Sequence, residues 1–307
     1  MRALLLLALI PAIGAAQESA APFSVGGRGF ATLQEAVGAI GDGEGTIRIA
    51  PGTYRQCATQ EKGRIAYVAD QPGTVVFTRV PCEGKAALVL RGRGASVDGI
   101  VFSHLEVQDG NGAGIRLEKG SLAVTRAMFL DSQSGILSAD DATGTISVDH
   151  STFSGLGKDP TGNGAHALYI GHYGALRVVA CRFERGTGGH YLKARALRVE
   201  VLDNSFDDTA GQHTNYMIDL SNGALGRIAG NEFVVGANKD NHSTLITVAP
   251  EGATNDSTGL VVENNRARLA PGVDYRPVLV GNWSGEAVVI RGNQLGAGIT
   301  PTARRWL

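Results

Sequence analysis

Hydrophobic residues recur along this chain with a period that is too long for one helix or one strand. A β-branched residue is followed five positions later by an aromatic or aliphatic residue, and this pair returns throughout the chain. The pairs are Val97/Phe102, Val124/Phe129, Val148/Phe153, Val178/Phe183, Val201/Phe206, Ile228/Phe233, Val262/Ala267 and Ile290/Leu295. Successive pairs begin 23 to 34 residues apart. A repeat of this length is typical of a solenoid, whose units bury their hydrophobic faces against one another.

Each unit contains a second short apolar segment, about 8 to 10 residues before the pair. Clear examples are residues 114–117, 168–170, 191–193, 217–220, 245–248 and 278–280. Two or three short strands per unit, without the 3.6-residue spacing of helical repeats, predict a parallel β-helix. Further fragments at 47–49, 66–68, 75–77 and 88–90 extend the stack to roughly ten coils over residues 41–296, with a tail at 297–307.

Small polar residues lie two positions before the aromatic member of the pair. They are Ser151, Cys181, Asn204, Asn231, Asn265 and Asn293 in successive units from the third onward. Asparagines stacked at a buried turn can hydrogen-bond along a column, so we predict an asparagine ladder. Cys181 is then a small buried turn residue.

The N-terminus has the pattern of a secretory signal peptide over residues 1–16. Met1 and Arg2 precede an apolar run from Ala3 to Ile13, and Gly14-Ala15-Ala16 provides a cleavage site. No later stretch reaches 18 apolar residues, so we expect no membrane span after cleavage. The sequence therefore predicts a secreted or periplasmic protein.

The exposed end of a β-helix needs a cap, and residues 31–40 are suited to this role. Thr32 and Glu35 form a capping-box pattern, followed by Ala36, Val37 and Ile40 at helical spacing. The stretch from Thr32 to Tyr54 resembles the opening of pectate-lyase-like right-handed β-helix proteins. This resemblance implies that residues 17–307 are one all-β domain, a right-handed parallel β-helix whose partner is a polysaccharide.

Composition narrows the function classes further. A formal net charge of −1 argues against a nucleic-acid partner, and 43% hydrophobic residues argue against disorder. Glycine makes up 43 of the 307 residues, in agreement with short strands and tight turns. Of the three cysteines, Cys57 and Cys82 are expected to form a disulfide in an oxidising compartment, with two unpaired thiols as the alternative.

Candidate chemistry gathers beside the strand that opens each unit. Long insertions at 154–166, 207–215, 234–243 and 268–277 fall at the same point of the repeat and predict the wall of a groove. His166, His190, His213 and His242 precede the adjoining strands in four consecutive coils. Strand alternation points Tyr169, Tyr191, Lys193, Met217 and Asp219 outward, with Arg195 beyond Lys193 and Arg116 two coils earlier.

The chemistry that these residues resemble is β-elimination of a uronate-containing polysaccharide. This reaction needs a cation for the substrate carboxylate, a base for the C5 proton and an acid for the leaving oxygen. Lyases of the superfamily often use Lys or Arg as the base on this sheet. We predict Lys193 as the base, because the Arg195 cation disfavours its charged form. Arg195 or Arg116 would hold the carboxylate, and Tyr191, Tyr169 or a histidine would be the acid.

The catalytic set is thus Lys193, Arg195, His190, Tyr191 and Asp219, and the substrate-binding set is Arg116, His166, Tyr169, His172, His213 and Tyr216. We expect a monomer without a metal ion or other cofactor, although the histidines offer a transition metal some ligands.

Two other functions stay open. A glycoside hydrolase would pair Asp219 with Asp207 or Asp208, because it needs two carboxyl groups about 5 to 9.5 Å apart. A carbohydrate-binding or surface-structural β-helix would stack sugars on Tyr169, Tyr191, Tyr216 and Trp283. Convergence of Lys193, Arg195 and a proton donor would favour an enzyme, whereas aromatics spread along the rod would favour binding.

Overall fold

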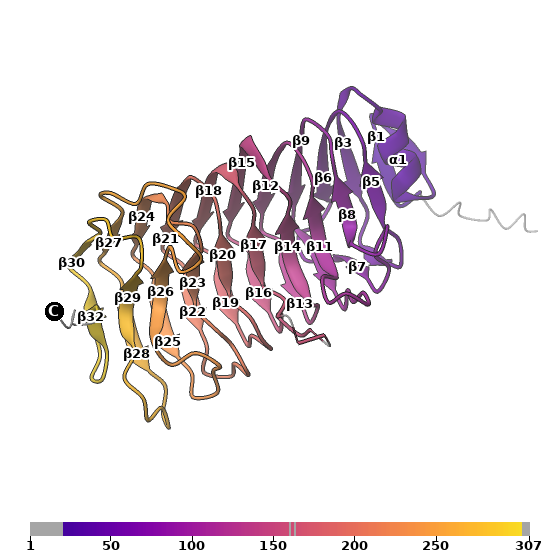
Figure 1. The fold of residues 1–307 in the computed structure, drawn as a ribbon. Helices are drawn as coiled ribbons and strands as arrows, with labels where there is room; N and C mark the ends of the chain where they lie inside the picture. The colour runs from indigo at the N-terminus through magenta and orange to yellow at the C-terminus, as the bar shows by residue number, and fades with distance from the viewer. Residues whose placement is uncertain (1–20, 160, 163, 303–307) are drawn as a thin grey trace, which may run out of the picture.

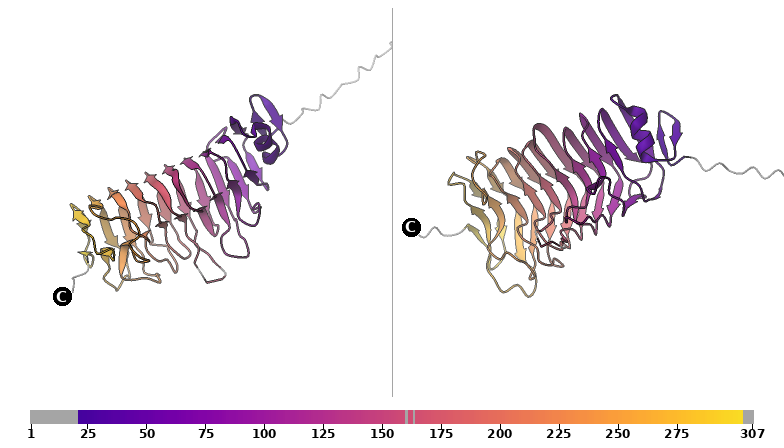
Figure 2. Two further views of the ribbon diagram at one scale, coloured as in Figure 1. Left: turned by 45° about the horizontal axis from the view of Figure 1, so that its top comes forward. Right: turned by 45° about the vertical axis from the view of Figure 1, so that its right-hand side comes forward.

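The computed structural model describes residues 21–159, 161–162 and 164–302, which form a rod of stacked coils (Figure 1). Each coil contributes one strand to each of three sheets, and successive coils lie one above another along the rod (Figure 2). About nine turns are stacked, close to the roughly ten that the repeat predicts. The predicted all-β parallel β-helix is confirmed.

The three sheets are named here A, B and C. Sheet A contains β1 (Phe23–Val25), β2 (Arg28–Phe30), β3 (Glu44–Ile49), β6 (Arg64–Ala69), β9 (Gly94–Asp98), β12 (Ser121–Thr125), β15 (Asp141–Asp149), β18 (Tyr173–Val179), β21 (Arg198–Leu202), β24 (Leu225–Ala229), β27 (Val261–Glu263) and β30 (Val289–Arg291). Sheet B contains β4 (Gly52–Tyr54), β7 (Val75–Thr78), β10 (Ile100–Ser103), β13 (Met128–Leu130), β16 (Thr152–Ser154), β19 (Arg182–Glu184), β22 (Ser205–Asp207), β25 (Glu232–Val235), β28 (Arg266–Leu269) and β31 (Gln294–Leu295). Sheet C contains β5 (Ala58–Gln60), β8 (Ala86–Leu90), β11 (Ala113–Leu117), β14 (Ser134–Ser138), β17 (Leu168–Ile170), β20 (Leu192–Ala194), β23 (Ile218–Leu220), β26 (Thr244–Val248), β29 (Val278–Asn282) and β32 (Thr300–Thr302).

The repeated hydrophobic pair marks the core-facing positions of sheets A and B. Val178 on β18 pairs in register with Val201 on β21, and Phe183 on β19 pairs with Phe206 on β22. All four side chains are buried. The two phenylalanine rings stack with 4.7 Å between their centroids. The sequence repeat therefore records one core layer per coil.

The predicted asparagine ladder is present at the turn between sheets A and B. The Nδ2 group of Asn204 donates to Asn231 Oδ1, and the pattern continues through Asn265 to Asn293, each bond being 2.9 Å. The backbone N–H of Cys181 donates to Asn204 Oδ1, and the Cys181 thiol is buried as predicted. The turn amides are satisfied along the rod instead of by water.

The N-terminal cap is formed by α1 (Leu33–Ile40), whose N-cap Thr32 and Glu35 make the predicted capping box. Leu33, Ala36 and Val37 are buried against the first coils. An antiparallel hairpin, β1 and β2, adds to the same end of sheet A and was not predicted. The Cys57–Cys82 disulfide is confirmed.

The C-terminal coil extends further than predicted. Residues 297–307 were expected to be a tail, but β32 pairs in parallel with β29, aligning Val278 with Thr300. Residues 303–307 and the predicted signal peptide at 1–16 lie outside the described residues. In the described part of the chain, no helix is long and apolar enough to cross a membrane.

Candidate functional site

The outward-facing side chains of sheet C form one row along the rod. In register they are Val89, Arg116, Leu137, Tyr169, Lys193, Asp219 and Thr247. The alternate residues of β17, β20 and β23 face the core and are fully buried, as predicted. Neighbouring members of this outer row are spaced by one coil, about 4.8 Å.

Lys193 on β20 and Arg195 in the loop that follows it both contact the carboxylate of Glu251. Lys193 Nζ contacts Glu251 Oε1, and Arg195 Nη2 lies 2.5 Å from Glu251 Oε2. Arg195 Nη1 also donates to Asn222 Oδ1 at 2.6 Å. Partial burial acts to raise the pKa of Glu251, but its hydrogen bonds to Lys193 and Arg195 outweigh this and lower the pKa to about 2. The carboxylate of Glu251 is therefore ionised at neutral pH.

Asp219, on the neighbouring strand β23, also contacts Lys193. Its Oδ2 lies 3.2 Å from Lys193 Nζ and accepts a hydrogen bond from Ser221. Its Oδ1 accepts a hydrogen bond from the Thr247 hydroxyl at 2.9 Å. The Asp219 side chain is only 2% exposed. It anchors Lys193 and is not presented to a ligand.

Tyr169 brings a hydroxyl group to the two cations. Arg195 Nε donates to the Tyr169 hydroxyl oxygen at 3.1 Å, and Lys193 Nζ lies 5.8 Å from the centre of the ring. Lys193, Arg195, Tyr169, Asp219 and Glu251 are called the cation site below. The side chains of Lys193 and Arg195 and the hydroxyl of Tyr169 therefore lie together.

Two of the predicted histidines stack beside the cation site. The rings of His166 and His190 lie 4.8 Å apart, and Tyr216 continues the stack at 5.2 Å from His190. The Nδ1 atom of His190 accepts a hydrogen bond from the Tyr216 backbone N–H, which leaves the ring proton of the neutral form on Nε2. That nitrogen lies 3.4 Å from Asp219 Oδ2. Burial lowers the pKa of His190 to about 3, so the ring is neutral.

Tyr191 was predicted to face outward, and this is wrong. Its ring is buried, and its hydroxyl donates to Asp208 Oδ1 at 2.7 Å. Met217, the corresponding residue one coil later, is buried too. Both residues precede the strands proper, where the chain is still turning from sheet B into sheet C, so strand alternation does not yet apply.

The predicted histidine column is also only partly correct. His213 is 72% exposed and pairs with Asp240 instead of joining His190. His242 stacks on Tyr275, away from the other two histidines. The loops differ in length between coils, so equal positions in the sequence are not equal positions on the rod. His172 lies at the turn toward sheet A, where it pairs with Asp140 at 3.2 Å.

Arg116 lies on the outer row but three positions from Lys193. At about 4.8 Å per coil this is roughly 14 Å, too far to hold the carboxylate of a sugar that reacts at Lys193. Its Nε atom is buried and has no hydrogen-bond partner among the described residues.

Asp219 does not pair with Asp207 or Asp208, the two partners that the hydrolase alternative named. Asp207 ends β22 in sheet B, and its carboxylate accepts the backbone N–H of Thr209. Asp208 is fully buried and bonded to Lys239, so it faces neither Asp219 nor a ligand. Within the described residues, no three His, Cys, Asp or Glu side chains are grouped so that they could hold a metal ion.

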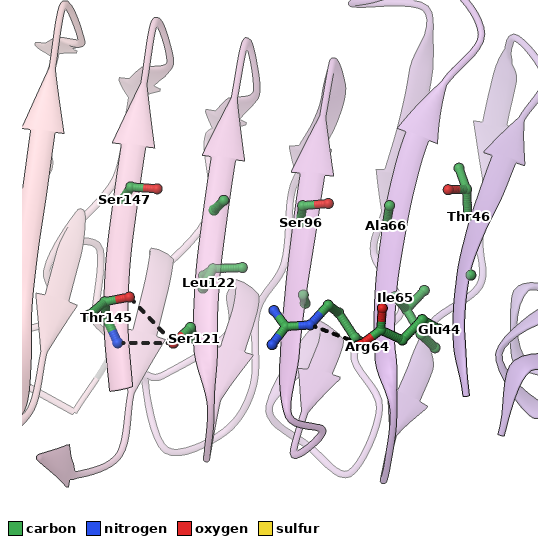
Figure 3. Close-up of a pocket in the computed structure, with 13 residues that line it drawn as sticks. Glu44, Thr46, Arg64, Ile65, Ala66, Ser96, Ser121, Leu122, Thr145 and Ser147 are labelled. Atoms are coloured by element: carbon green, nitrogen blue, oxygen red, sulfur yellow. Dashed lines mark hydrogen bonds and ion pairs between the residues drawn. The ribbon is translucent and has the colours of Figure 1, made fainter. Parts of the chain in front are cut away.

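Sheet A carries a separate shallow hollow of about 510 Å³ on its outer face (Figure 3). Small side chains line it in register, including Thr46, Ala66, Ser96, Ala123 and Ser147. Its charged groups, Glu44 and Arg64, form an ion pair at 3.5 Å along one side. This face offers hydroxyl groups but lacks the convergence of charges seen in the cation site.

Sequence reasoning missed Glu251, Asn222 and Thr247. Glu251 is 58 residues from Lys193 and belongs to a loop without a repeat pattern. Thr247 could have been found, because it occupies the outer-row position one coil after Asp219.

Comparison with solved structures agrees with the fold. ORF18 of Geobacillus virus E2 is 12% identical with a TM-score of 0.49, the alignment covering 84% of this chain and 57% of that one. The PL6 family alginate lyase AlyGC is 13% identical with a TM-score of 0.50, over 84% of this chain and 40% of that one. The likeness to the alginate lyase shows the fold alone, and this chain is a parallel β-helix.

A pectin methylesterase from Aspergillus niger is matched at 13% identity and a TM-score of 0.40, over 92% of this chain and 89% of the esterase. The chain spans less than two thirds of the length of the viral protein and of the alginate lyase. No family model matches the sequence, and no curated protein is detectably similar to it.

Proposed function

We propose that this β-helix protein is a polysaccharide lyase that cleaves a uronate-containing glycan by metal-independent β-elimination. The observation that carries the proposal is the carboxylate shared by Lys193 and Arg195, which shows that their two charges are spaced to bind one carboxylate. A uronate bound in that position would have its negative charge neutralised by side chains alone. The Tyr169 hydroxyl, bonded to Arg195, would lie beside the reacting sugar.

The proposed reaction uses the cations to stabilise charge and Tyr169 to move a proton. Lys193 and Arg195 would bind the uronate carboxylate and stabilise the negative charge that builds up on it in the transition state. Tyr169 in its phenolate form, held by the Arg195 N–H, would take the C5 proton as the C5–H bond breaks. The C4–O bond then breaks, a C4=C5 double bond forms, and the same proton passes from Tyr169 to the leaving oxygen.

This assignment changes the role that the sequence indicated for Lys193. Two carboxylates contact its ammonium group, Asp219 at 3.2 Å and Glu251 from above. In both contacts Nζ faces a carboxylate oxygen, so the group is placed to bind carboxylates. Lys193 is therefore proposed as a carboxylate-binding cation, and His190 as a positioning residue that contacts Asp219.

A lyase on this fold has a precedent, because the alginate lyase named above is also a parallel β-helix. Identity of 13% supports the fold alone, so the substrate class rests on the chemistry of the cation site.

We also propose that the protein is secreted or periplasmic after removal of residues 1–16. N-terminal sequencing of the protein from fractionated cells tests this location.

Ultraviolet absorbance of the unsaturated product, with a panel of uronate polysaccharides, tests the proposed reaction. We expect absorbance that rises with and without a chelator and is lost in Lys193→Ala and Tyr169→Phe. Arg48→Ala, on the outer face of sheet A, is the matched control and keeps the activity. New reducing ends without absorbance would instead indicate hydrolysis. Binding without either product would indicate a carbohydrate-binding protein.

A further inference from the structure

Glu251, which contacts both Lys193 and Arg195, covers these two cations. The Lys193 side chain is 8% exposed and that of Arg195 is 20% exposed, whereas Glu251 above them is 41% exposed. A ligand that approaches sheet C from solvent therefore meets Glu251 before it meets either cation. Direct contact between a ligand carboxylate and Lys193 requires the Glu251 side chain to leave.

The anchoring of Glu251 allows its side chain to leave without unfolding the coil. Its backbone N–H donates to the Ser221 carbonyl at 3.0 Å, and Asn222 Nδ2 donates to the next carbonyl, that of Gly252. The backbone is thus tied to the preceding coil, whereas the carboxylate contacts Lys193 and Arg195. Gly252 has a φ of +116° and open space where a Cβ would lie.

The charge of the site determines what can take the place of Glu251. The positive charges of Lys193 and Arg195 are balanced by the negative charges of Asp219 and Glu251. Adding a further anion to the site would therefore cost free energy. Removing Glu251 without a replacement would leave two poorly solvated cations facing one buried carboxylate, which is unfavourable. A carboxylate from a ligand would form the same ion pairs as Glu251. Exchanging one carboxylate for the other therefore changes the free energy of the site little. A neutral sugar offers no such replacement.

We propose that Glu251 is a resident occupant of the carboxylate-binding site, and that only a sugar with its own carboxylate displaces it. This inference rests on the proposed function and deepens it, because it makes Glu251 a specificity-determining residue for acidic glycans. In the free protein Glu251 keeps Lys193 and Arg195 in position. In the complex the uronate carboxylate takes over both contacts, and Glu251 moves to solvent.

Calorimetric binding of oligouronates tests the displacement. The measurement uses the Tyr169→Phe background so that the ligand is not consumed, and the neutral reduced oligosaccharide of the same sugar is the comparison ligand. We expect Glu251→Gln to bind the oligouronate at least tenfold more tightly, with no change for the neutral ligand. Glu232→Gln, an exposed glutamate on sheet B, makes the same change in net charge and is the control.

Weaker or unchanged oligouronate binding by Glu251→Gln, relative to the Glu232→Gln control, would overturn the displacement, because it would mean that Glu251 stays and contacts the sugar. Glu251→Asp is a second variant that keeps the charge but shortens its reach, and we expect intermediate affinity. Tighter binding without any unsaturated product from the wild type supports displacement but rejects the lyase. Product formation without tighter binding rejects displacement and leaves the lyase.

Discussion

Lys239 and Asp208 form an ion pair inside the protein, with 3.1 Å between Nζ and Oδ2. Their side chains are 3% and 0% exposed, and Asp208 also accepts hydrogen bonds from Tyr191 and Thr214. The backbone of Thr214 forms isolated β-bridges with Gly189 and Lys239 in the adjacent coils. The Lys239–Asp208 pair therefore connects the turns that lead from sheet B to sheet C. Those turns carry His190 and Tyr216 to the cation site.

Replacing one partner of this pair should destabilise the protein strongly. Lys239→Met leaves the Asp208 carboxylate buried without its cation, and we expect a loss of about 3–5 kcal/mol in the free energy of unfolding. Adding Asp208→Asn removes the unpaired charge while keeping its shape, so the double variant should recover part of the loss. Urea denaturation of the three proteins measures this, and a double variant less stable than Lys239→Met would contradict it.

The asparagine ladder should be similarly sensitive at its centre. Asn231 is 1% exposed and donates to Val201 O at 2.8 Å, while its Oδ1 accepts from the Asn204 backbone N–H at 2.9 Å. Asn231→Ala leaves both backbone groups buried and unpaired, which we expect to cost about 2–4 kcal/mol. Thermal and urea unfolding measure the loss. Asn111→Ala, in an exposed turn, should change stability by less than about 0.5 kcal/mol.

His190 should make the protein sensitive to mild acid. Burial lowers its pKa in the folded state from 6.5 to about 3, so between these values the unfolded chain binds the extra proton. The stability from neutral His190 is therefore fully present above pH 6.5 and is lost as the pH falls toward 3. Relative to wild type, His190→Gln should flatten this slope by at most about 1.4 kcal/mol per pH unit, the limit for one proton.

Urea denaturation at intervals from pH 7 to pH 4 measures that slope. His150→Gln is the control, because the side chain of His150 is 66% exposed. Equal slopes for wild type and His190→Gln would contradict the prediction.

Arg116 and Arg195 should differ in their effect on turnover. The outer row separates Arg116 from Lys193 by three coils, whereas Arg195 contacts both Tyr169 and Glu251. If the protein is a lyase, Arg195→Ala should lower kcat by at least 100-fold, and Arg116→Ala should leave kcat within about twofold of wild type. Steady-state kinetics on a single oligouronate decides between them, and equal losses of kcat would contradict this geometry.

Much of the fold could be read from single residues, because each coil repeats the same local requirements. The Val178/Phe183 pair, the Asn204 position and the Thr32 capping box each describe contacts made within one coil or between adjacent coils. The hairpin of β1 and β2 was missed because it does not repeat. The orientation of Tyr191 was misjudged because alternation was applied to a turn.

The same distinction between repeating and non-repeating segments applies to the candidate site. The sequence by itself determined that Tyr169, Lys193 and Asp219 share the outer row, since strand alternation and the repeat length place them there. Only the tertiary structure decided that Glu251 closes over Lys193 and Arg195, and that Asp208 is buried with Lys239. Repeating strands have one register that hydrophobic burial imposes. Loops of unequal length have no such register, and their side chains are positioned by charges and hydrogen bonds that form only after the coils have stacked.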